Sequence, residues 1–80
     1  MMEDLFARHR DIARAELKRK YRDFDAQLKK WKRQIKSRCR KSNPISAALK
    51  MRKKYNLEGD NALWLILATC EIMEERKKGR

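Results

Sequence analysis

The amino-acid sequence predicts an all-α protein with one long N-terminal helix and two shorter helices, assembled as a helical homodimer. The chain has 80 residues, of which 42% are charged and 41% hydrophobic, and it contains only two glycines and one proline. This mixture, rich in alanine, leucine, lysine, arginine and glutamate, favours long helices over sheets or disorder. Apolar residues recur at helical spacing in three segments, which predicts helices at about 3–41, 44–57 and 61–77. We expect residues 1–80 to form a single helical domain with a modest core.

The first segment, 3–41, is predicted to be one continuous helix because it contains no glycine or proline. At 1.5 Å per residue it would be about 55–60 Å long, which exceeds the diameter of an 80-residue globule. Its apolar residues follow one another in steps of four and three, the spacing of heptad positions a and d. We name them the apolar stripe: Leu17, Tyr21, Phe24, Leu28, Trp31 and Ile35. A stripe this narrow favours packing against a partner helix, as in a coiled coil, over burial in a broad core.

Sequence signals mark the ends of the two shorter helices. Asn43 is a suitable N-cap, and Pro44 suits the first helical position that follows it. Gly59 fits a left-handed position that ends the second helix, and Asp60 is expected to cap the third. Residues 62–68 are apolar on nearly every face of a helix, which therefore has to be buried all round. Two neighbouring helices would hardly cover it in a monomer, which indicates a second subunit and most simply a two-fold homodimer.

The positive charge is concentrated in one part of the chain, whose formal net charge is +12. Residues 26–57, which we name the basic segment, hold twelve lysines and arginines and no acidic residue. The flanks are nearly neutral, at +1 for residues 1–25 and −1 for residues 58–80. A surface that serves solubility alone would intersperse both signs. An external polyanion would offset the self-repulsion of this segment, and a solvated charged face is the competing interpretation.

Lysines and arginines spaced by helical turns can contact successive phosphates and release their counterions. The residues expected to bind nucleic acid lie on the outer sides of the first two helices. They are Lys29, Lys30, Arg33, Lys36, Arg40, Lys41, Lys50, Lys53 and Lys54. Sequence-specific readout is not indicated, because a sequence does not separate base contacts from phosphate contacts. Trp31 and Tyr21 are expected to pack in the core, which leaves Tyr55 as the best candidate for stacking on a base.

The sequence shows no pattern typical of an enzyme, a metal site or a cofactor site. The one histidine, His9, has no evident nucleophile or metal partner, and the glycine-rich phosphate loop, Cys-x-x-Cys and HExxH motifs are missing. Cys39 lies among basic residues that could favour a thiolate, whereas Cys70 is expected in the core. Two cysteines without a close motif fit a reducing cytoplasm. The longest apolar run, 62–68, is too short to span a bilayer, and we expect no signal peptide.

The sequence therefore predicts a small accessory protein, not an enzyme, that binds nucleic acid and most simply the DNA backbone through the basic segment. The alternative is a protein–protein interaction adaptor or inhibitor whose long helix docks on an acidic partner surface. A helix-turn-helix is disfavoured because the third helix begins with apolar residues in place of groups that read a major groove. Attachment to anionic lipid is disfavoured because the outer face of the long helix lacks apolar residues to insert.

Overall fold

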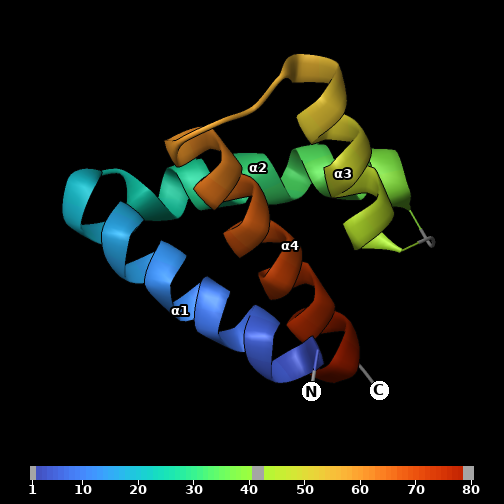
Figure 1. Cartoon of the computed structure of the whole chain (residues 1–80), viewed down its shortest axis with the longest axis horizontal. Coiled ribbons are helices and arrows are strands. Elements are labelled where there is room, and N and C mark those ends of the chain that lie inside the picture. The colour runs from blue at the N-terminus through green and yellow to red at the C-terminus, as the bar shows by residue number, and fades with distance from the viewer. Residues whose placement is uncertain (1, 41–42, 79–80) are drawn as a thin grey trace.

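The computed structural model describes residues 2–40 and 43–78, with side chains from residue 8 onward. This part of the chain contains four helices and no strand (Figure 1). The helices are α1 (Met2–Lys20), α2 (Phe24–Cys39), α3 (Pro44–Tyr55) and α4 (Asp60–Lys78). The prediction of an all-α protein is confirmed, and the molecule measures 31 × 27 × 24 Å along its principal axes.

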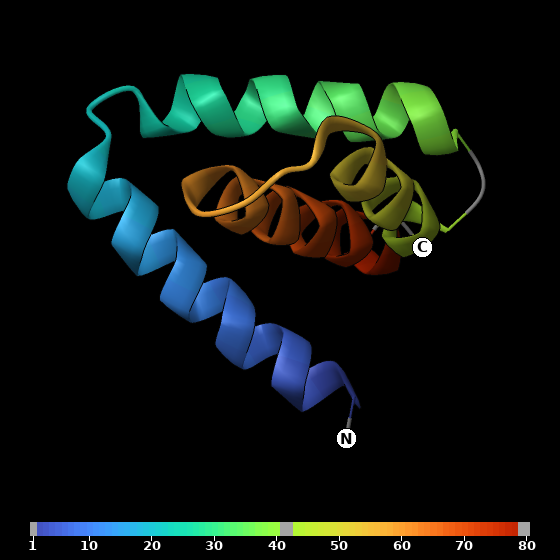
Figure 2. The same ribbon diagram turned by 45° about the horizontal axis from the view of Figure 1, so that its top comes forward.

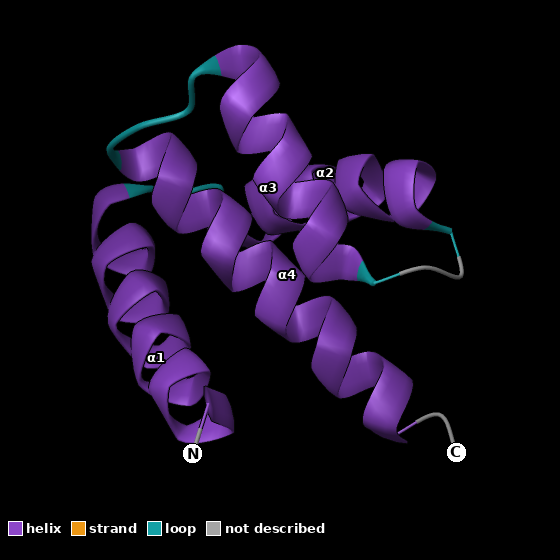
Figure 3. Cartoon of the chain, turned by 45° about the vertical axis from the view of Figure 1, so that its right-hand side comes forward, coloured by secondary structure: helices purple, strands orange, loops and turns teal. Residues whose placement is uncertain are grey.

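The last helix, α4, is the one that the other three helices cover. Helices α1 and α2 pack on it from two directions, and α3 lies beside both α2 and α4 (Figures 1 and 3). The buried side chains of α4 are Trp64, Leu65, Leu67, Ala68, Thr69, Cys70 and Ile72. Three helices of the same chain thus bury most of this apolar segment, but Ala62, Leu63 and Ile66 are only partly buried, so the predicted burial on every side is incomplete. The argument for a second subunit no longer holds, and the homodimer stays a prediction.

The prediction of one continuous helix over 3–41 is wrong. The helix breaks at Tyr21, Arg22 and Asp23, and α2 leaves the break in a new direction (Figure 2). The amide of Tyr21 still donates to the Leu17 carbonyl at 2.9 Å, but Asp23 adopts φ −94° and ψ 35°. This ψ lies far from the helical value of about −42°, so the regular hydrogen-bond ladder ends here.

Contacts from a distant part of the chain hold this break in place. The Tyr21 hydroxyl donates to the Asp60 carboxylate at 2.9 Å, and the Lys20 ammonium donates to the same carboxylate at 3.2 Å. Asp60 thus lies at the first position of α4, where its carboxylate joins α4 to the end of α1. The Asp60 carboxylate accepts hydrogen bonds from these two side chains and not from an amide of its own helix, so it does not act as the predicted N-cap.

The break allows both halves of the apolar stripe to reach the same helix. Leu17 from α1 and Leu28 and Ile35 from α2 are buried in one core with α4. A straight helix would diverge from α4 and could bury only part of the stripe, whereas two helices joined by a bend bury most of it. The stripe therefore finds its helix partner within its own chain, and a coiled coil between chains stays a prediction.

The beginning of α3 follows the predicted capping signals, but its end does not. The Asn43 side chain accepts a hydrogen bond from the Ile45 amide at 2.9 Å, and Pro44 is the first helical residue. The helix then stops at Tyr55, two residues before the predicted end, because Asn56 adopts the left-handed conformation at φ 51° and ψ 50°. Asparagine tolerates this conformation better than most residues, which explains why it ends α3.

Gly59 also has a positive φ of 61°, in agreement with the sequence prediction of a left-handed residue. It lies in the α3–α4 loop, directly before α4, and its carbonyl accepts the Leu63 amide at 3.2 Å. Its conformation therefore turns the chain into α4 and does not end α3.

Candidate nucleic-acid interface

Acidic residues of α4 neutralise part of the positive charge of α1 and α2. The ion pairs are Arg10–Glu74, Arg14–Glu71 at 3.4 Å, Lys20–Asp60 at 3.2 Å, Lys32–Glu75 and Lys36–Glu75 at 3.0 Å. Hydrogen bonds first from Lys32 and then from Lys36 hold the pKa of the Glu75 carboxyl below its usual value of 4.5. The acids of α4 thus lie along its borders with α1 and α2, and not at the border between α2 and α3.

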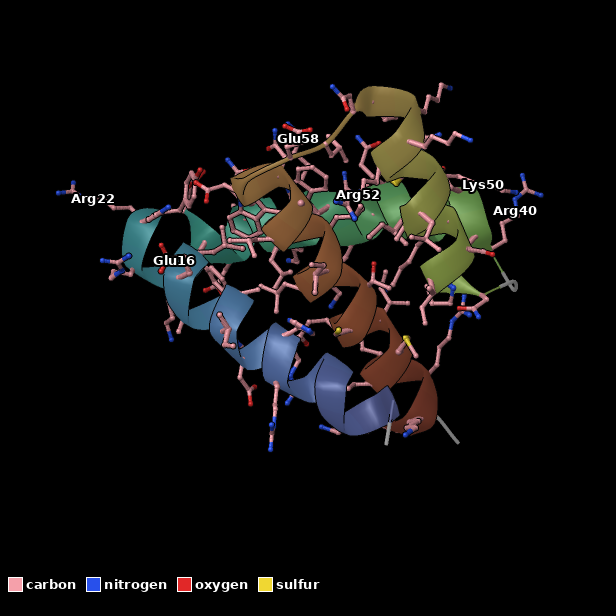
Figure 4. All side chains as sticks on the ribbon, in the orientation of Figure 1. Glu16, Arg22, Arg40, Lys50, Arg52 and Glu58 are labelled. Carbon is pink, nitrogen blue, oxygen red and sulfur yellow. The ribbon has the colours of Figure 1, made fainter. Side chains whose placement is uncertain are left out.

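The other described cations of the basic segment are exposed and form no ion pair with a described residue. They are Lys29, Lys30, Arg33, Arg38, Arg40, Lys50, Arg52, Lys53 and Lys54. The fold therefore leaves most of the basic segment as uncompensated charge at the surface. Lys50 and Arg40 both project outward on the side of the molecule where α2 ends and α3 begins (Figure 4).

Helical geometry divides the cations of α2 into two rows. Residues two apart lie about 160° apart around a helix axis, so Arg38 points away from both Lys36 and Arg40. One row follows steps of four, three and four: Lys29, Arg33, Lys36 and Arg40. Of the other cations, Lys32 pairs with Glu75, whereas Lys30 and Arg38 line pockets on the side of α2 that borders α3.

A cationic pocket of about 300 Å³ lies between α2 and α3. We use this name for the space lined by Arg38, Ser46, Ala47, Lys50, Met51 and Lys54. Lys50 and Lys54 lie one turn apart on α3 and face Arg38 across the pocket, and no acidic residue lines it. Three exposed cations around one hollow, with a serine hydroxyl beside them, have the chemistry to bind a phosphate group.

Tyr55 fixes the position of the arginine in this pocket. The Arg38 guanidinium donates to the Tyr55 hydroxyl at 2.6 Å and also lies 5.3 Å from the centre of its ring. The Lys54 ammonium lies 5.4 Å from the same centre. The hydrogen bond from Arg38, followed by the charges of Arg38 and Lys54, lowers the pKa of the Tyr55 hydroxyl from its usual 10.0. The ring therefore holds two cations at the pocket before any ligand arrives.

An aromatic pocket of about 430 Å³ lies on the other side of Met51, which lines both hollows. It is lined by Tyr21, Gln27, Lys30, Trp31, Gln34, Met51, Tyr55, Leu57, Asn61 and Trp64. Tyr21 and Trp31 are partly buried and Tyr55 is 49% exposed, so aromatic surface faces this pocket from α2, α3 and the break. Its volume falls within the range of about 300–1,000 Å³ that is typical of small-molecule sites.

The wall of the aromatic pocket is rigid where it meets the core. The Trp64 ring is 98% buried and packs on Tyr21 and Phe24, each with ring centres 5.5 Å apart. The Tyr21 hydroxyl donates a hydrogen bond to Asp60, which fixes its orientation and raises its pKa above the usual 10.0. Packed rings with a fixed hydroxyl give the pocket a shape that does not depend on a ligand.

The structure brings some of the predicted nucleic-acid-binding residues together and separates others. Lys50 and Lys54 line the cationic pocket, and Lys30 lines the aromatic pocket beside it. The row on the other side of α2 is Lys29, Arg33, Lys36 and Arg40, of which Lys36 is paired with Glu75. Lys53 is exposed on α3 and lines neither pocket, and Lys41 lies outside the described residues.

Arg38 lines the cationic pocket, but it was not among the residues that the sequence predicted to bind nucleic acid. The spacing of the cations could have indicated its separate position. Arg38 lies two residues from both Lys36 and Arg40, so its side chain leaves the helix on a different side from theirs. Trp31 and Tyr21 pack against the core as expected, but they also line the aromatic pocket. No sequence pattern could locate this pocket, because the break in the first helix creates one of its walls.

The residues considered for other chemistry lie apart from both pockets. His9 is exposed on α1. Cys39 and Cys70 are buried, and burial raises the pKa of the Cys70 thiol. Within residues 2–40 and 43–78, no cluster of histidine, cysteine or acidic side chains could hold a metal ion.

Comparisons with protein-family models, with curated proteins and with solved structures find no match to this chain. Across the described helices, none combines the length and the apolar character needed to cross a membrane.

Proposed function

We propose that this chain is a small accessory protein that binds the phosphate backbone of nucleic acid along the border between α2 and α3. It acts in the cytoplasm as a binding protein and not as an enzyme. The phosphates contact Arg38, Lys50 and Lys54 in the cationic pocket. Lys30 extends this contact along α2, and Lys29, Arg33 and Arg40 add charge from the neighbouring row.

The observation that carries the proposal is the separation of paired from unpaired charge. Acidic residues of α4 pair with Arg10, Arg14, Lys20, Lys32 and Lys36, whereas the cations around the cationic pocket form no ion pair with a described residue. A cation that is exposed only for solubility does not need to converge with others on one hollow. Convergence of Arg38, Lys50 and Lys54 raises their mutual repulsion, which a bound phosphate relieves by replacing counterions.

The proposal is tested by binding to duplex DNA and to single-stranded RNA across a salt series, with three variants of equal charge change. The first variant, which we name the cleft variant, changes the cations of the cationic pocket through Arg38→Gln, Lys50→Gln and Lys54→Gln. The row variant carries Lys29→Gln, Arg33→Gln and Arg40→Gln. The control variant carries Arg8→Gln, Lys18→Gln and Lys78→Gln, which change exposed cations outside the basic segment.

We expect the cleft variant to bind more weakly and to reduce the slope of log affinity against log salt by up to about 3, because each lost phosphate contact removes about 0.7–0.9. The control variant should keep nearly the native slope, and the row variant should fall between the two. Circular dichroism checks that each variant keeps its helices. Binding that is missing at low salt, that ignores salt, or that falls equally in all three variants would contradict the proposal.

The alternative function, an adaptor that docks on an acidic protein through a long helix, has lost part of its basis. The predicted long helix is replaced by two helices, α1 and α2, and most of their apolar stripe is buried against α4. An apolar groove of about 130 Å³ remains between α3 and α4, where Leu49 is 60% exposed (Figure 4 shows Arg52 at this border). Salt-dependent binding to polyglutamate as tight as binding to nucleic acid would favour this alternative.

A further inference from the structure

The aromatic pocket has a composition that core packing alone does not explain. Leaving aromatic surface open to water costs stability, at about 25 cal/mol for each Å² of apolar surface. Tyr21, Trp31 and Tyr55 nevertheless line a hollow that stays open beside the cationic pocket. Open aromatic surface of this kind, in a wall of fixed shape, is typical of a site that a flat, apolar-faced ligand fills.

The rim of the same pocket carries amide groups that can read the edge of such a ligand. Gln34 and Asn61 are exposed and form no side-chain hydrogen bond with a described residue. The Gln27 amide nitrogen donates to the Asp23 carboxylate at 3.1 Å, which orients this side chain at the rim. Each amide offers both a donor and an acceptor, the pairing that the edges of nucleobases present.

The charge around the aromatic pocket favours a ligand that carries phosphate on one side. Met51 forms a wall shared with the cationic pocket, and Tyr55 lines the aromatic pocket while it holds Arg38 and Lys54 in place. No acidic residue lines the aromatic pocket, and Asp60, which accepts a hydrogen bond from Tyr21 in its wall, is also bound by Lys20. A base in one hollow and its phosphate in the next would therefore match the lining of both.

We propose that the aromatic pocket accepts an unpaired base of single-stranded nucleic acid, whose adjoining phosphates bind Arg38, Lys50 and Lys54. The base stacks on the open aromatic surface, and the amides of Gln34 and Asn61 bond its edge. A base within a duplex is stacked and paired, and it could enter a pocket between helices only by leaving its stack. The protein therefore prefers single strands to duplexes. This inference rests on the phosphate binding proposed above and names the form of nucleic acid bound.

Tryptophan fluorescence provides a direct test, because both tryptophans of the chain, Trp31 and Trp64, line the pocket. The native protein is titrated with a single-stranded oligonucleotide, with an abasic strand that has the same number of phosphates, with the matching duplex and with a 5′-mononucleotide. We expect the oligonucleotide to quench the fluorescence and to bind about tenfold more tightly than the abasic strand, the gain typical of one stacked base. The abasic strand should bind with a salt dependence but quench little.

Substitutions at Tyr55 and at the rim then assign the effect to the pocket. Tyr55→Ala should lose about tenfold in affinity for the oligonucleotide, whereas Tyr55→Phe keeps the ring and most of the stacking. Gln34→Ala and Asn61→Ala change exposed side chains, so they test the pocket even if loss of the Tyr55 ring disturbs the fold. Leu49→Ala is the matched control, because it removes an exposed apolar side chain away from the aromatic pocket.

The results separate this inference from the proposed function. Equal affinity for the base-containing and abasic strands, with a steep salt slope that the cleft variant reduces, would overturn the base pocket and leave phosphate binding intact. Equal or tighter binding of the duplex would also overturn it. Quenching by the mononucleotide with no gain in affinity from the strand would identify a small-molecule site instead. If no nucleic acid binds at low salt, both proposals fail.

Discussion

The position of α4 at the centre of the fold predicts different costs for two neighbouring substitutions. Leu67 is fully buried among the other helices, whereas Ile66 is partly buried and lines the groove between α3 and α4. Replacing a fully buried leucine by alanine costs about 2–5 kcal/mol, through lost burial and the cavity that remains. We expect about 3 kcal/mol for Leu67→Ala and about 1 kcal/mol for Ile66→Ala, whose site is open to solvent.

These costs are large relative to the stability expected for the whole chain. A domain of 80 residues has a free energy of unfolding of about 4–12 kcal/mol. With a urea m-value of about 1 kcal/mol/M, the unfolding midpoint should fall by about 3 M for Leu67→Ala and by about 1 M for Ile66→Ala. Circular dichroism at 222 nm follows the transition. Equal m-values in both variants would show that the substitutions change the free energy of unfolding and not the surface exposed on unfolding.

Equal costs, or a larger cost for Ile66→Ala, would refute the helical register of α4, since the two side chains lie about 100° apart around its axis. Repeating the titrations over a hundredfold range of protein concentration tests the homodimer at the same time. A midpoint that rises with concentration would indicate that a second subunit stabilises the fold, because folding linked to association depends on concentration. A midpoint that stays constant agrees with α4 being covered within one chain.

Substitutions at four further positions test local features. Asn43→Ala should cost about 1 kcal/mol, since the Ile45 amide loses its cap, and Asn43→Ser should retain most of the stability in urea denaturation. Asn56→Gly should stabilise the protein by a few tenths of a kcal/mol in the same assay, because glycine adopts the left-handed conformation at no steric cost. Tyr21→Phe removes the hydrogen bond to Asp60 and should cost about 1 kcal/mol. The folded pKa of Glu75 is lowered, so its stabilising contribution is present above pH 4.5 and is lost as the pH falls through the lower folded value. The difference in stability between the native and Glu75→Gln proteins should therefore shrink between about pH 6 and pH 3 at low salt.

The sequence predicted those helix ends that are set by residues within the same turn. The cap at Asn43 and the proline after it act within one turn, so the beginning of α3 was predictable. The burial of the apolar segment of α4 was predictable for a similar reason, because a helix without a polar face has no side to expose. The left-handed residue at Asn56 was missed, because Gly59 three residues later gave the stronger signal.

The break between α1 and α2 was not predictable from local signals. No glycine or proline marks it, and the apolar stripe keeps its heptad steps through Tyr21 and Phe24. Its cause lies in the tertiary structure, since Asp60 is 39 residues from Tyr21 in sequence and contacts it only once α4 has packed. Burial of the stripe on α4 from two directions outweighs the few hydrogen bonds that the break removes.

The same packing decides which cations remain available to a ligand. The sequence shows twelve basic residues in an acid-free segment, but it does not show that the acids of α4 lie within reach of Lys32 and Lys36. Because α4 packs with its acids toward α1 and one side of α2, the opposite side of α2 meets α3 with no acid near Arg38. The break then places Tyr21 next to Trp31 and Trp64, which adds an aromatic pocket to that side. The packing of α4 thus decides which cations of the acid-free segment stay uncompensated, and it creates the adjoining aromatic pocket, which would not exist in the single straight helix that the local sequence favours.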